Sequence, residues 1–276
     1  MKKVAEISQG HVTGFFKIYP NGSTGAGFNI ADALETEVVV ENATKNSHKI
    51  FINGKLRKDA VTSEKVIWKY LKKTKKKFSI VVRHFTKYPI GYGLGLSGAG
   101  AFSLSKALNK ALGTKLKEKM VVDIAARAEI EAGTGLGDVV AEQFNGMIIG
   151  LPPFPSKKVA KLKNKYKYAV FAFFAPISTK KIIRSREWKK TINIFGEYAM
   201  KKVSEKKTAK EFIRLCRIFA MQTKLVPEKV KPVLKEFPES SMAMLGETAF
   251  VLTNKPEEVE RKLKKFTKNT AVAKIS

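Results

Sequence analysis

The 276-residue sequence has little cysteine, few acidic residues and no long hydrophobic run, and each scarcity excludes a class of protein. The single cysteine, Cys216, excludes an intrachain disulfide and a cysteine-cluster metal site, and it is typical of a reducing compartment. The longest apolar run, residues 168–177, is too short to span a bilayer and predicts a buried strand. The first ten residues lack the apolar core of a secretory signal. We therefore expect a cytoplasmic protein without a membrane partner.

Acidic residues are outnumbered: 24 Asp and Glu stand against 53 Lys and Arg, which gives a net charge of +29. Such a positive field attracts polyanions and small anionic substrates. The basic residues are spread over many predicted helices, and no zinc finger or aromatic RNA-binding motif accompanies them. This pattern argues against a nucleic-acid partner, although a basic nucleic-acid-binding protein without catalysis remains an alternative.

Hydrophobic residues make up 44% of the chain, enough to build a packed core in two domains. Three prolines within residues 151–156 mark the best boundary, which predicts an N-terminal domain over 1–150 and a C-terminal domain over 151–276. Strand-like and helix-period segments alternate in both halves, which predicts an α/β or α+β fold. The expected strands cover residues 12–18, 36–41, 48–52, 78–84, 144–150, 168–175 and 249–253; the expected helices cover 60–74, 97–112, 118–131, parts of 187–235 and 256–267; residues 240–247 are expected to form a loop.

A glycine-rich loop leads directly into a predicted helix at residues 91–100, which read GYGLGLSGAG. Glycine lets the backbone approach a ligand closely, and the start of a helix presents free N–H groups at the positive end of its dipole. Phosphate is the common occupant of such a site. The alternative is a tight helix entrance packed on a strand. Five glycines and one serine in ten residues favour phosphate binding.

The spacing Gly93-x-Gly95-x-x-Gly98 matches the dinucleotide-binding fingerprint, but its context does not. That fingerprint requires a second strand ending in an acidic residue about 20 positions later, whereas residues 115–133 have helical periodicity. The P-loop sequence GxxxxGK[ST] and the HRD and DFG motifs of protein kinases are also absent. The loop is therefore interpreted as a phosphate site of another kind.

A second glycine-rich turn carries acidic residues. In AEIEAGTGLGDVVAEQFNG, residues 128–146, Glu129 and Glu131 end a predicted helix and Asp138 follows the turn. Phosphoryl transfer needs a group that orients or deprotonates the attacking hydroxyl, and a carboxylate for Mg²⁺, which takes oxygen ligands. A solvated helix end and a turn aspartate are the alternative. The neighbouring phosphate loop favours the catalytic interpretation.

Residues 89–100 resemble the second motif of the GHMP kinases, P-x-x-x-G-L-G-S-S-A-A, with Leu96 in place of the first serine and Gly98 in place of the first alanine. This superfamily includes galactokinase, homoserine kinase and mevalonate kinase. The resemblance implies an α+β fold of two-layer α/β sandwiches, with a nucleotide cleft between two domains and ATP and Mg²⁺ as cofactors. It implies Mg²⁺ on Ser97 and Glu129, with Glu131 as second choice, and Asp138 as the catalytic base. The implied ATP contacts are Pro89, Gly91, Gly93, Leu94, Gly95, Ser97, Gly98, Ala99 and Gly100.

The opening GHVTGFFKIYPNGSTGAGFNI, residues 10–30, is similar to the start of the archaeal pantoate kinases, P-G-H-I-T-G-F-F followed by G-S-x-G-A-G. GTGLGD at 133–138 and SMAMLG at 241–246 also resemble that family. The resemblance implies ATP-dependent phosphorylation of (R)-pantoate to (R)-4-phosphopantoate in archaeal coenzyme A biosynthesis, by a homodimer. The implied acceptor site comprises His11, Ser23, Gly133, Thr134 and Gly246.

The sequence departs from that family at two positions for which the resemblance implies a role in binding the substrate carboxylate. Ala126 stands where the family tends to have histidine, and Gly150 stands where a strand often ends in arginine. A GHMP kinase for another small acid or alcohol, such as shikimate, homoserine or mevalonate, therefore remains an alternative. Possible replacements for the missing side chains are His11, Ser23, Arg127, Lys180 and Arg184.

Overall fold

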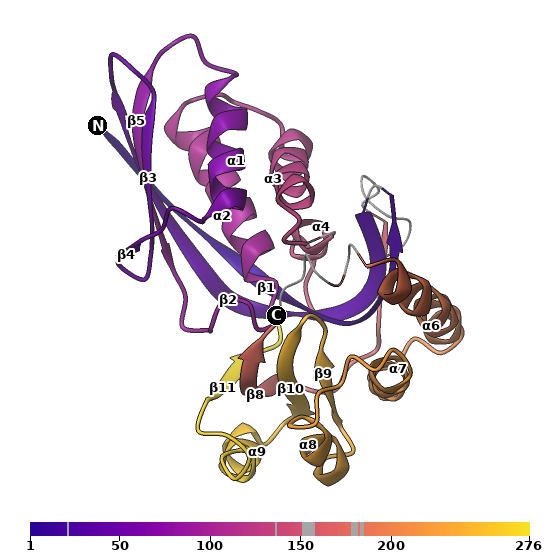
Figure 1. The fold of residues 1–276 in the computed structure, drawn as a ribbon. Helices are drawn as coiled ribbons and strands as arrows, with labels where there is room; N and C mark the ends of the chain where they lie inside the picture. The colour runs from indigo at the N-terminus through magenta and orange to yellow at the C-terminus, as the bar shows by residue number, and fades with distance from the viewer. Residues whose placement is uncertain (21, 136, 151–157, 178–181, 183–184) are drawn as a thin grey trace.

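The computed structural model describes the whole chain except residues 21, 136, 151–157, 178–181 and 183–184. The described residues form two β-sheets with helices packed on them, which confirms the α+β class (Figure 1). The larger sheet has the strand order β4-β3-β5-β2-β6-β7, with β1 paired to β2, and the smaller has the order β11-β8-β10-β9. The strands are β1 (Lys2–Tyr19), β2 (Gly22–Asn42), β3 (Ser47–Ile52), β4 (Lys55–Leu56), β5 (Phe78–Phe85), β6 (Met147–Gly150), β7 (Val159–Lys161), β8 (Tyr168–Pro176), β9 (Ser240–Ala243), β10 (Gly246–Thr253) and β11 (Thr270–Lys274). The helices are α1 (Val61–Leu71), α2 (Leu96–Ala111), α3 (Glu118–Ala132), α4 (Asp138–Ala141), α6 (Arg186–Glu205), α7 (Ala209–Gln222), α8 (Lys231–Glu236) and α9 (Pro256–Leu263).

The two longest strands, β1 and β2, form an antiparallel pair that curves from the helix-covered part of the larger sheet toward the C-terminal helices (Figure 1). Register shifts near Gln9 and Gly14 mark bulges, which bend a strand and increase its twist. Strand β2 also pairs with β6 near its start, through Ala26–Phe28, and with β5 near its end, through Glu35–Asn42. The pair therefore connects the two halves of the molecule.

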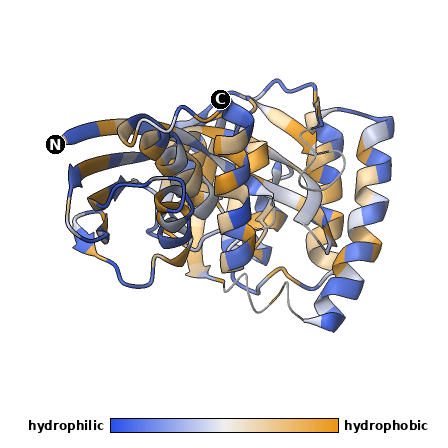
Figure 2. Cartoon of the chain, turned by 90° about the horizontal axis from the view of Figure 1, so that it is seen from above, coloured by the Kyte–Doolittle hydropathy of each residue, from blue (hydrophilic) through white to orange (hydrophobic). Residues whose placement is uncertain are grey.

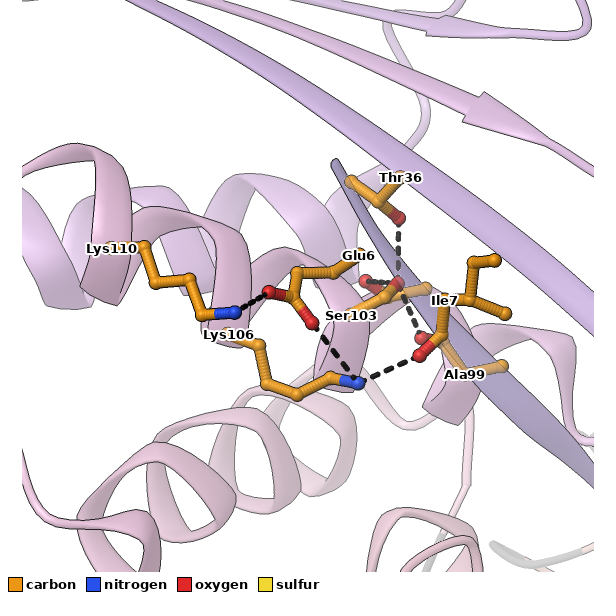
Figure 3. Close-up of polar contacts among 8 residues, drawn as sticks. Glu6, Ile7, Thr36, Ala99, Ser103, Lys106 and Lys110 are labelled. Carbon is orange, nitrogen blue, oxygen red and sulfur yellow. Dashed lines mark hydrogen bonds and ion pairs between the residues drawn. The ribbon is translucent and has the colours of Figure 1, made fainter. Parts of the chain in front are cut away.

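Helices α1, α2 and α3 cover one face of the larger sheet (Figure 1). Polar contacts hold α2 against β1 and β2, as Figure 3 shows. Glu6 of β1 pairs with Lys106 and Lys110 of α2. The Ser103 hydroxyl of the same helix lies 2.6 Å from the Thr36 hydroxyl of β2. These contacts fix α2, and with it the glycine loop that precedes it, on the sheet.

The C-terminal half shares its core with β1 and β2. Phe28 of β2 stacks on Phe171 of β8 with ring centroids 6.4 Å apart, and it meets Phe250 of β10 edge-on at 5.1 Å. A second cluster of buried residues lies between α1–α3 and the larger sheet. Hydrophobic and hydrophilic residues alternate along the helices (Figure 2), as expected where one face packs on a core. Among the described helices, none is long and apolar enough to cross a bilayer.

Most predicted elements are confirmed, with differences in extent. Strands β1 and β2 extend far beyond residues 12–18 and 36–41, because their remaining parts pair with each other. The expected loop over 240–247 instead begins with β9, all four residues of which are buried, so no alternation marked it. Strand β7 pairs with β6 in the larger sheet, although it follows the expected domain boundary. The proline-rich residues 151–156 lie outside the described part of the chain.

Candidate active site

Two connected cavities form a cleft. The larger, of about 420 Å³, is lined by parts of residues 11–34, 52–63, 84–100 and 132–138 and by Ile177, Met244 and Leu245. The smaller, of about 50 Å³, extends between β2, α4 and the start of β7. Both are lined by His11, Ser23 and Asp138, so Asp138 lies where the cavities meet.

The glycine loop before α2 forms one wall of the larger cavity. Gly93 and Gly95 take positive φ angles of 82° and 70°, and Gly95 is the N-cap of α2. Because this N-cap has no side chain to accept the first-turn N–H groups, those groups can bind an anion. A Cβ at position 95 would lie 2.7 Å from the His11 backbone nitrogen, so glycine is required here. Of the expected phosphate contacts, Gly91, Gly93, Leu94, Gly95, Ser97 and Gly100 line the cavity, whereas Pro89, Gly98 and Ala99 do not.

Three hydroxyl groups meet where this loop, the start of α1 and the second glycine turn come together. The Ser97 hydroxyl donates to Thr134 Oγ1 at 2.9 Å and lies 3.3 Å from Thr62 Oγ1. The hydroxyls of Thr62 and Thr134 are 2.8 Å apart. Thr134, expected at the acceptor site, therefore contacts the serine of the phosphate loop. No sequence motif marked Thr62, because it lies 35 positions before Ser97.

Three acidic residues converge beneath the first turn of α2. A Cβ at Gly98 would lie 3.0 Å from the Cβ of Asp138, 3.0 Å from Glu142 Oε1 and 3.1 Å from Glu129 Oε1. An alanine at this position would crowd the three carboxyl side chains, and glycine leaves them more room. Glu129 is fully buried and Glu142 is 2% exposed. The backbone N–H groups of Val139 and Ala99 lie near Glu129 and Glu142, respectively, but neither makes a well-formed hydrogen bond to the carboxyl group.

Burial raises the pKa of all three carboxyl groups. It raises the pKa of Asp138 to about 6, and it raises the pKa of Glu129 and of Glu142 well above the ordinary value. The charge of Asp138 adds to the shifts of both glutamates. Because like charges oppose one another's ionisation, the three groups titrate as a coupled set that retains a proton more strongly than isolated carboxylates do.

The structure gives different surroundings to Glu129, the first-choice metal ligand, and Glu131, the second choice. Glu129 faces the glycine loop, whereas Glu131 is exposed and pairs with Lys69 of α1 at 2.6 Å. Sequence reasoning missed Glu142, although its position four residues after Asp138 places it one helical turn further on. Within the described chain, no group of three His, Cys, Asp or Glu forms a complete metal cage. A Mg²⁺ that also binds phosphates and water needs only one or two protein oxygens, and the Ser97 hydroxyl and the Glu129 carboxylate are suitable donors.

Glu142→Gln should flatten the pH dependence of stability. Because the pKa of Glu142 is raised in the folded state, its stabilising effect is complete below about pH 4.5 and is lost as the pH rises through the folded pKa. The substitution removes one group that binds its proton more tightly in the folded state. It should therefore reduce the slope of unfolding free energy against pH by up to about 1.4 kcal/mol per pH unit. Urea unfolding at pH 5, 6 and 7 measures the slope. Glu131→Gln, at an exposed site, is the control, and parallel curves for wild type and Glu142→Gln would contradict the assignment.

His11 is held as a neutral hydrogen-bond acceptor. The Asn29 amide donates to the carbonyl oxygens of Ala141, at 2.7 Å, and Phe144, so its Oδ1 is left to accept from His11 Nδ1 at 2.6 Å. Burial lowers the pKa of His11 to about 4. The assigned tautomer thus carries its proton on Nδ1 and leaves the Nε2 lone pair unprotonated. His11 lines both cavities, so this nitrogen is suited to accept a hydrogen bond from a hydroxyl ligand.

The remaining expected acceptor residues divide into two groups. Ser23 and Gly133 line the larger cavity. Gly246 does not; it packs on the backbone of Tyr92 and Gly93 and supports the glycine loop from below.

The positions that depart from the family have different surroundings. Ala126 is buried in α3 and Arg127 is exposed on it, and neither lines the cleft, whereas Gly150 lines the smaller cavity. Lys158, which sequence reasoning did not consider, also lines that cavity. It directly precedes Val159, the residue of β7 that pairs with Gly150. Lys180 and Arg184 lie outside the described residues.

Comparisons with known proteins agree with this geometry. Residues 62–146 match the family model described as the GHMP kinases N terminal domain. The chain is 34% identical to a pantoate kinase of Methanocaldococcus jannaschii, over 98% of this chain and 99% of that protein. It is 28% identical to a pantoate kinase of Thermococcus kodakarensis, over 91% and 87% of the two chains.

Solved structures share the fold. A "phosphotransferase related to CoA biosynthesis pathway" superposes with a TM-score of 0.88 at 22% identity, covering 99% of this chain and 96% of that one. A homoserine kinase of Cytophaga hutchinsonii gives 0.69 at 18% identity, covering 100% and 96%. A glycine loop at a helix start, beside carboxyl groups in a cleft of this fold, defines an ATP-dependent small-molecule kinase of the GHMP type. Within that superfamily the chain belongs to the pantoate kinase family.

Proposed function

We propose that this protein transfers the γ-phosphoryl group of ATP to the 4-hydroxyl of (R)-pantoate, giving (R)-4-phosphopantoate and ADP in archaeal coenzyme A biosynthesis. The full-length likeness to pantoate kinases supports the substrate. The observation that carries the mechanism is the position of Asp138 at the junction of the two cavities. A carboxylate there can reach an acceptor hydroxyl at this junction while a phosphate chain occupies the larger cavity.

ATP binds in the larger cavity, with its phosphates on the N–H groups of residues 95–98 at the start of α2. Ser97 and Glu129 would hold Mg²⁺, which supplies charge neutralisation to the phosphates when it is bound. Because Gly98 has no side chain, the three carboxyl groups can pack closely beneath the first turn of α2. The residues therefore act mainly by positioning the reactants and by electrostatic stabilisation.

The acceptor binds where the two cavities meet, next to Asp138 and His11, and extends into the smaller one. The Asp138 carboxylate accepts the proton of the attacking hydroxyl as its oxygen bonds to the γ-phosphorus and the bond to ADP breaks. His11 Nε2 and the Ser23 hydroxyl are suited to bind the other pantoate oxygens. Lys158 is the cationic side chain among the described residues of this cavity, and it can bind the substrate carboxylate in place of the family's arginine at position 150.

The wider organisation follows from the same proposal. Residues 1–150 form the nucleotide-binding domain and residues 151–276 a second domain that closes the cleft, with β7 crossing between them. The net charge of +29 would steer the anionic reactants toward the cleft. The likeness to the pantoate kinases supports a homodimer. The single cysteine supports a reducing cytoplasm as the compartment.

Lys158→Met should raise the KM for pantoate by about tenfold, the loss of one charge-assisted hydrogen bond, while the KM for ATP stays unchanged. Lys158→Arg should keep most of the affinity because it keeps the charge. Initial rates at varied pantoate and saturating ATP measure this effect. Lys161→Met, at the other end of β7 and outside the cavity lining, is the control. An unchanged KM for pantoate in Lys158→Met would remove this residue from the acceptor site.

The function itself is tested by ADP release from Mg²⁺·ATP with pantoate, shikimate, homoserine and mevalonate offered separately. Turnover that is fastest with pantoate supports the assignment despite Ala126 and Gly150. Turnover with one of the other acceptors keeps the kinase mechanism and changes the substrate. No turnover with any of the four, although ATP binds, would reject the proposed reaction.

A further inference from the structure

The hydroxyl groups of Ser97, Thr62 and Thr134 form a closed triangle that the proposed reaction does not by itself explain. The three oxygen–oxygen distances are 2.9 Å from Ser97 to Thr134, 2.8 Å from Thr134 to Thr62, and 3.3 Å from Ser97 to Thr62. The three residues come from the phosphate loop, the second glycine turn and the first turn of α1, and all three line the larger cavity. The triangle thus joins three walls of the cleft at one point.

A hydroxyl that binds a cation must point a lone pair at the cation and give its proton to another acceptor. Each hydroxyl has one proton and two lone pairs, so the neighbours of Ser97 decide which way its lone pairs point. Thr134 accepts the Ser97 proton at 2.9 Å. Thr134 can do so only if its own proton points elsewhere. Thr62, at 2.8 Å, is its best acceptor, since the carbonyl oxygen of Glu129 lies 3.5 Å away.

Thr62 occupies a fixed position, which makes it effective as this acceptor. It is 6% exposed in the first turn of α1, and the next residue, Ser63, bonds to His84 Nε2 at 3.0 Å. His84 in turn contacts Thr36 at 2.8 Å, and burial lowers the pKa of His84 to about 4, so the ring stays neutral. Thr36 bonds to Ser103 of α2 (Figure 3). This chain ties the start of α1 to the helix that follows the phosphate loop.

We infer that Thr62 is a positioning residue for the nucleotide-bound metal: through Thr134 it orients the Ser97 hydroxyl so that a lone pair faces the cation. The inference rests on the proposed role of Ser97 in binding Mg²⁺·ATP. Thr62 need not touch the metal or the phosphates. The Thr62 hydroxyl acts on Ser97 through Thr134. Removing this hydroxyl should therefore weaken metal-dependent nucleotide binding and leave metal-free nucleotide binding unchanged.

The test is calorimetric titration of ATP into the whole protein, without acceptor, in Mg²⁺ and separately in EDTA. Thr62→Val keeps the shape of the side chain and removes the hydroxyl. It should weaken Mg²⁺·ATP binding by about three- to tenfold, the value of one hydrogen bond, and change metal-free ATP binding less than about twofold. Thr62→Ser should restore binding. Thr191→Val removes a helical hydroxyl outside the cleft lining and should change neither affinity.

A double-mutant cycle with Ser97→Ala distinguishes positioning from a general structural role. In the Ser97→Ala background, Thr62→Val should cost less than about twofold further, because no hydroxyl remains to be oriented. An equal loss in both backgrounds, an equal loss with and without Mg²⁺, or no loss in Thr62→Val would each overturn the inference while leaving the proposed reaction intact. If Ser97→Ala itself leaves Mg²⁺·ATP affinity unchanged, the metal role proposed for Ser97 fails, and the inference fails with it.

Discussion

Asp138→Asn should lower kcat with pantoate by about 10²- to 10⁴-fold while the protein stays folded. The substitution keeps the shape of the side chain and removes the carboxylate that accepts the proton of the attacking hydroxyl. Asp138 lines both cavities, so no other described carboxyl group is placed equally well: Glu129 and Glu142 are buried beneath the loop. The residual rate should come from the positioning of ATP and acceptor, which the substitution does not disturb.

The pH profile gives a second readout for Asp138. Because burial raises the pKa of Asp138 to about 6, the wild-type rate should fall as the pH drops through about 6, where the carboxylate becomes protonated. Asp138→Asn should lose this acid limb as well as the rate. Glu131→Gln, which removes an exposed carboxylate paired with Lys69, should change neither. A kcat within threefold of wild type, or an acid limb that survives in Asp138→Asn, would assign proton transfer to another group.

Gly246→Ala should damage both stability and ATP binding, although Gly246 lines neither cavity. A Cβ at this position would overlap the backbone carbonyl of Tyr92 and lie 2.6 Å from the Gly93 nitrogen. Backbone atoms cannot move aside as a flexible side chain can, so either the loop or the start of β10 must shift. We expect a loss of about 1–3 kcal/mol in the free energy of unfolding. The KM for ATP should rise about tenfold or more, because the displaced loop carries the phosphate site.

Urea unfolding and ATP saturation kinetics measure the two effects of Gly246→Ala. Gly113→Ala is the matched control: this glycine ends α2 at a positive φ of 64°, and a Cβ there would meet nothing within 4 Å. It should cost stability through backbone strain and leave the KM for ATP unchanged. If Gly246→Ala destabilises the fold but binds ATP normally, the packing of β10 against the loop serves the fold alone. If it changes neither quantity, the close approach itself is wrong.

The features that could be predicted from the sequence are those that neighbouring residues determine. A glycine loop opening a helix shows its phosphate-binding character over ten consecutive residues, because the N–H groups and the glycines that expose them belong to one segment. The α+β class and most helices follow from local periodicity in the same way. The superfamily likewise could be identified from the short motifs around Gly95 and Asp138.

The residues that were missed act through contacts between distant segments. Glu142 is significant because folding places it beneath Gly98, next to Glu129 and Asp138. Lys158 is significant because the following strand, β7, pairs with β6 beside Gly150. Thr62 lies 35 positions from Ser97, and only the packing of α1 against the two glycine turns brings their hydroxyls together. Hydrogen bonds and charge interactions act over a few ångströms, so sequence distance hides them.

The sequence by itself therefore determined the chemical groups available to this protein: a phosphate-binding backbone, acidic residues after a glycine turn, and a strongly positive surface. The tertiary structure alone decided which of those groups work together. It buries Glu129 beneath the glycine loop and leaves Glu131 exposed and paired with Lys69. It also raised the pKa of Asp138 toward neutrality, because desolvation depends on the three-dimensional surroundings of a carboxyl group and not on its neighbours in the chain.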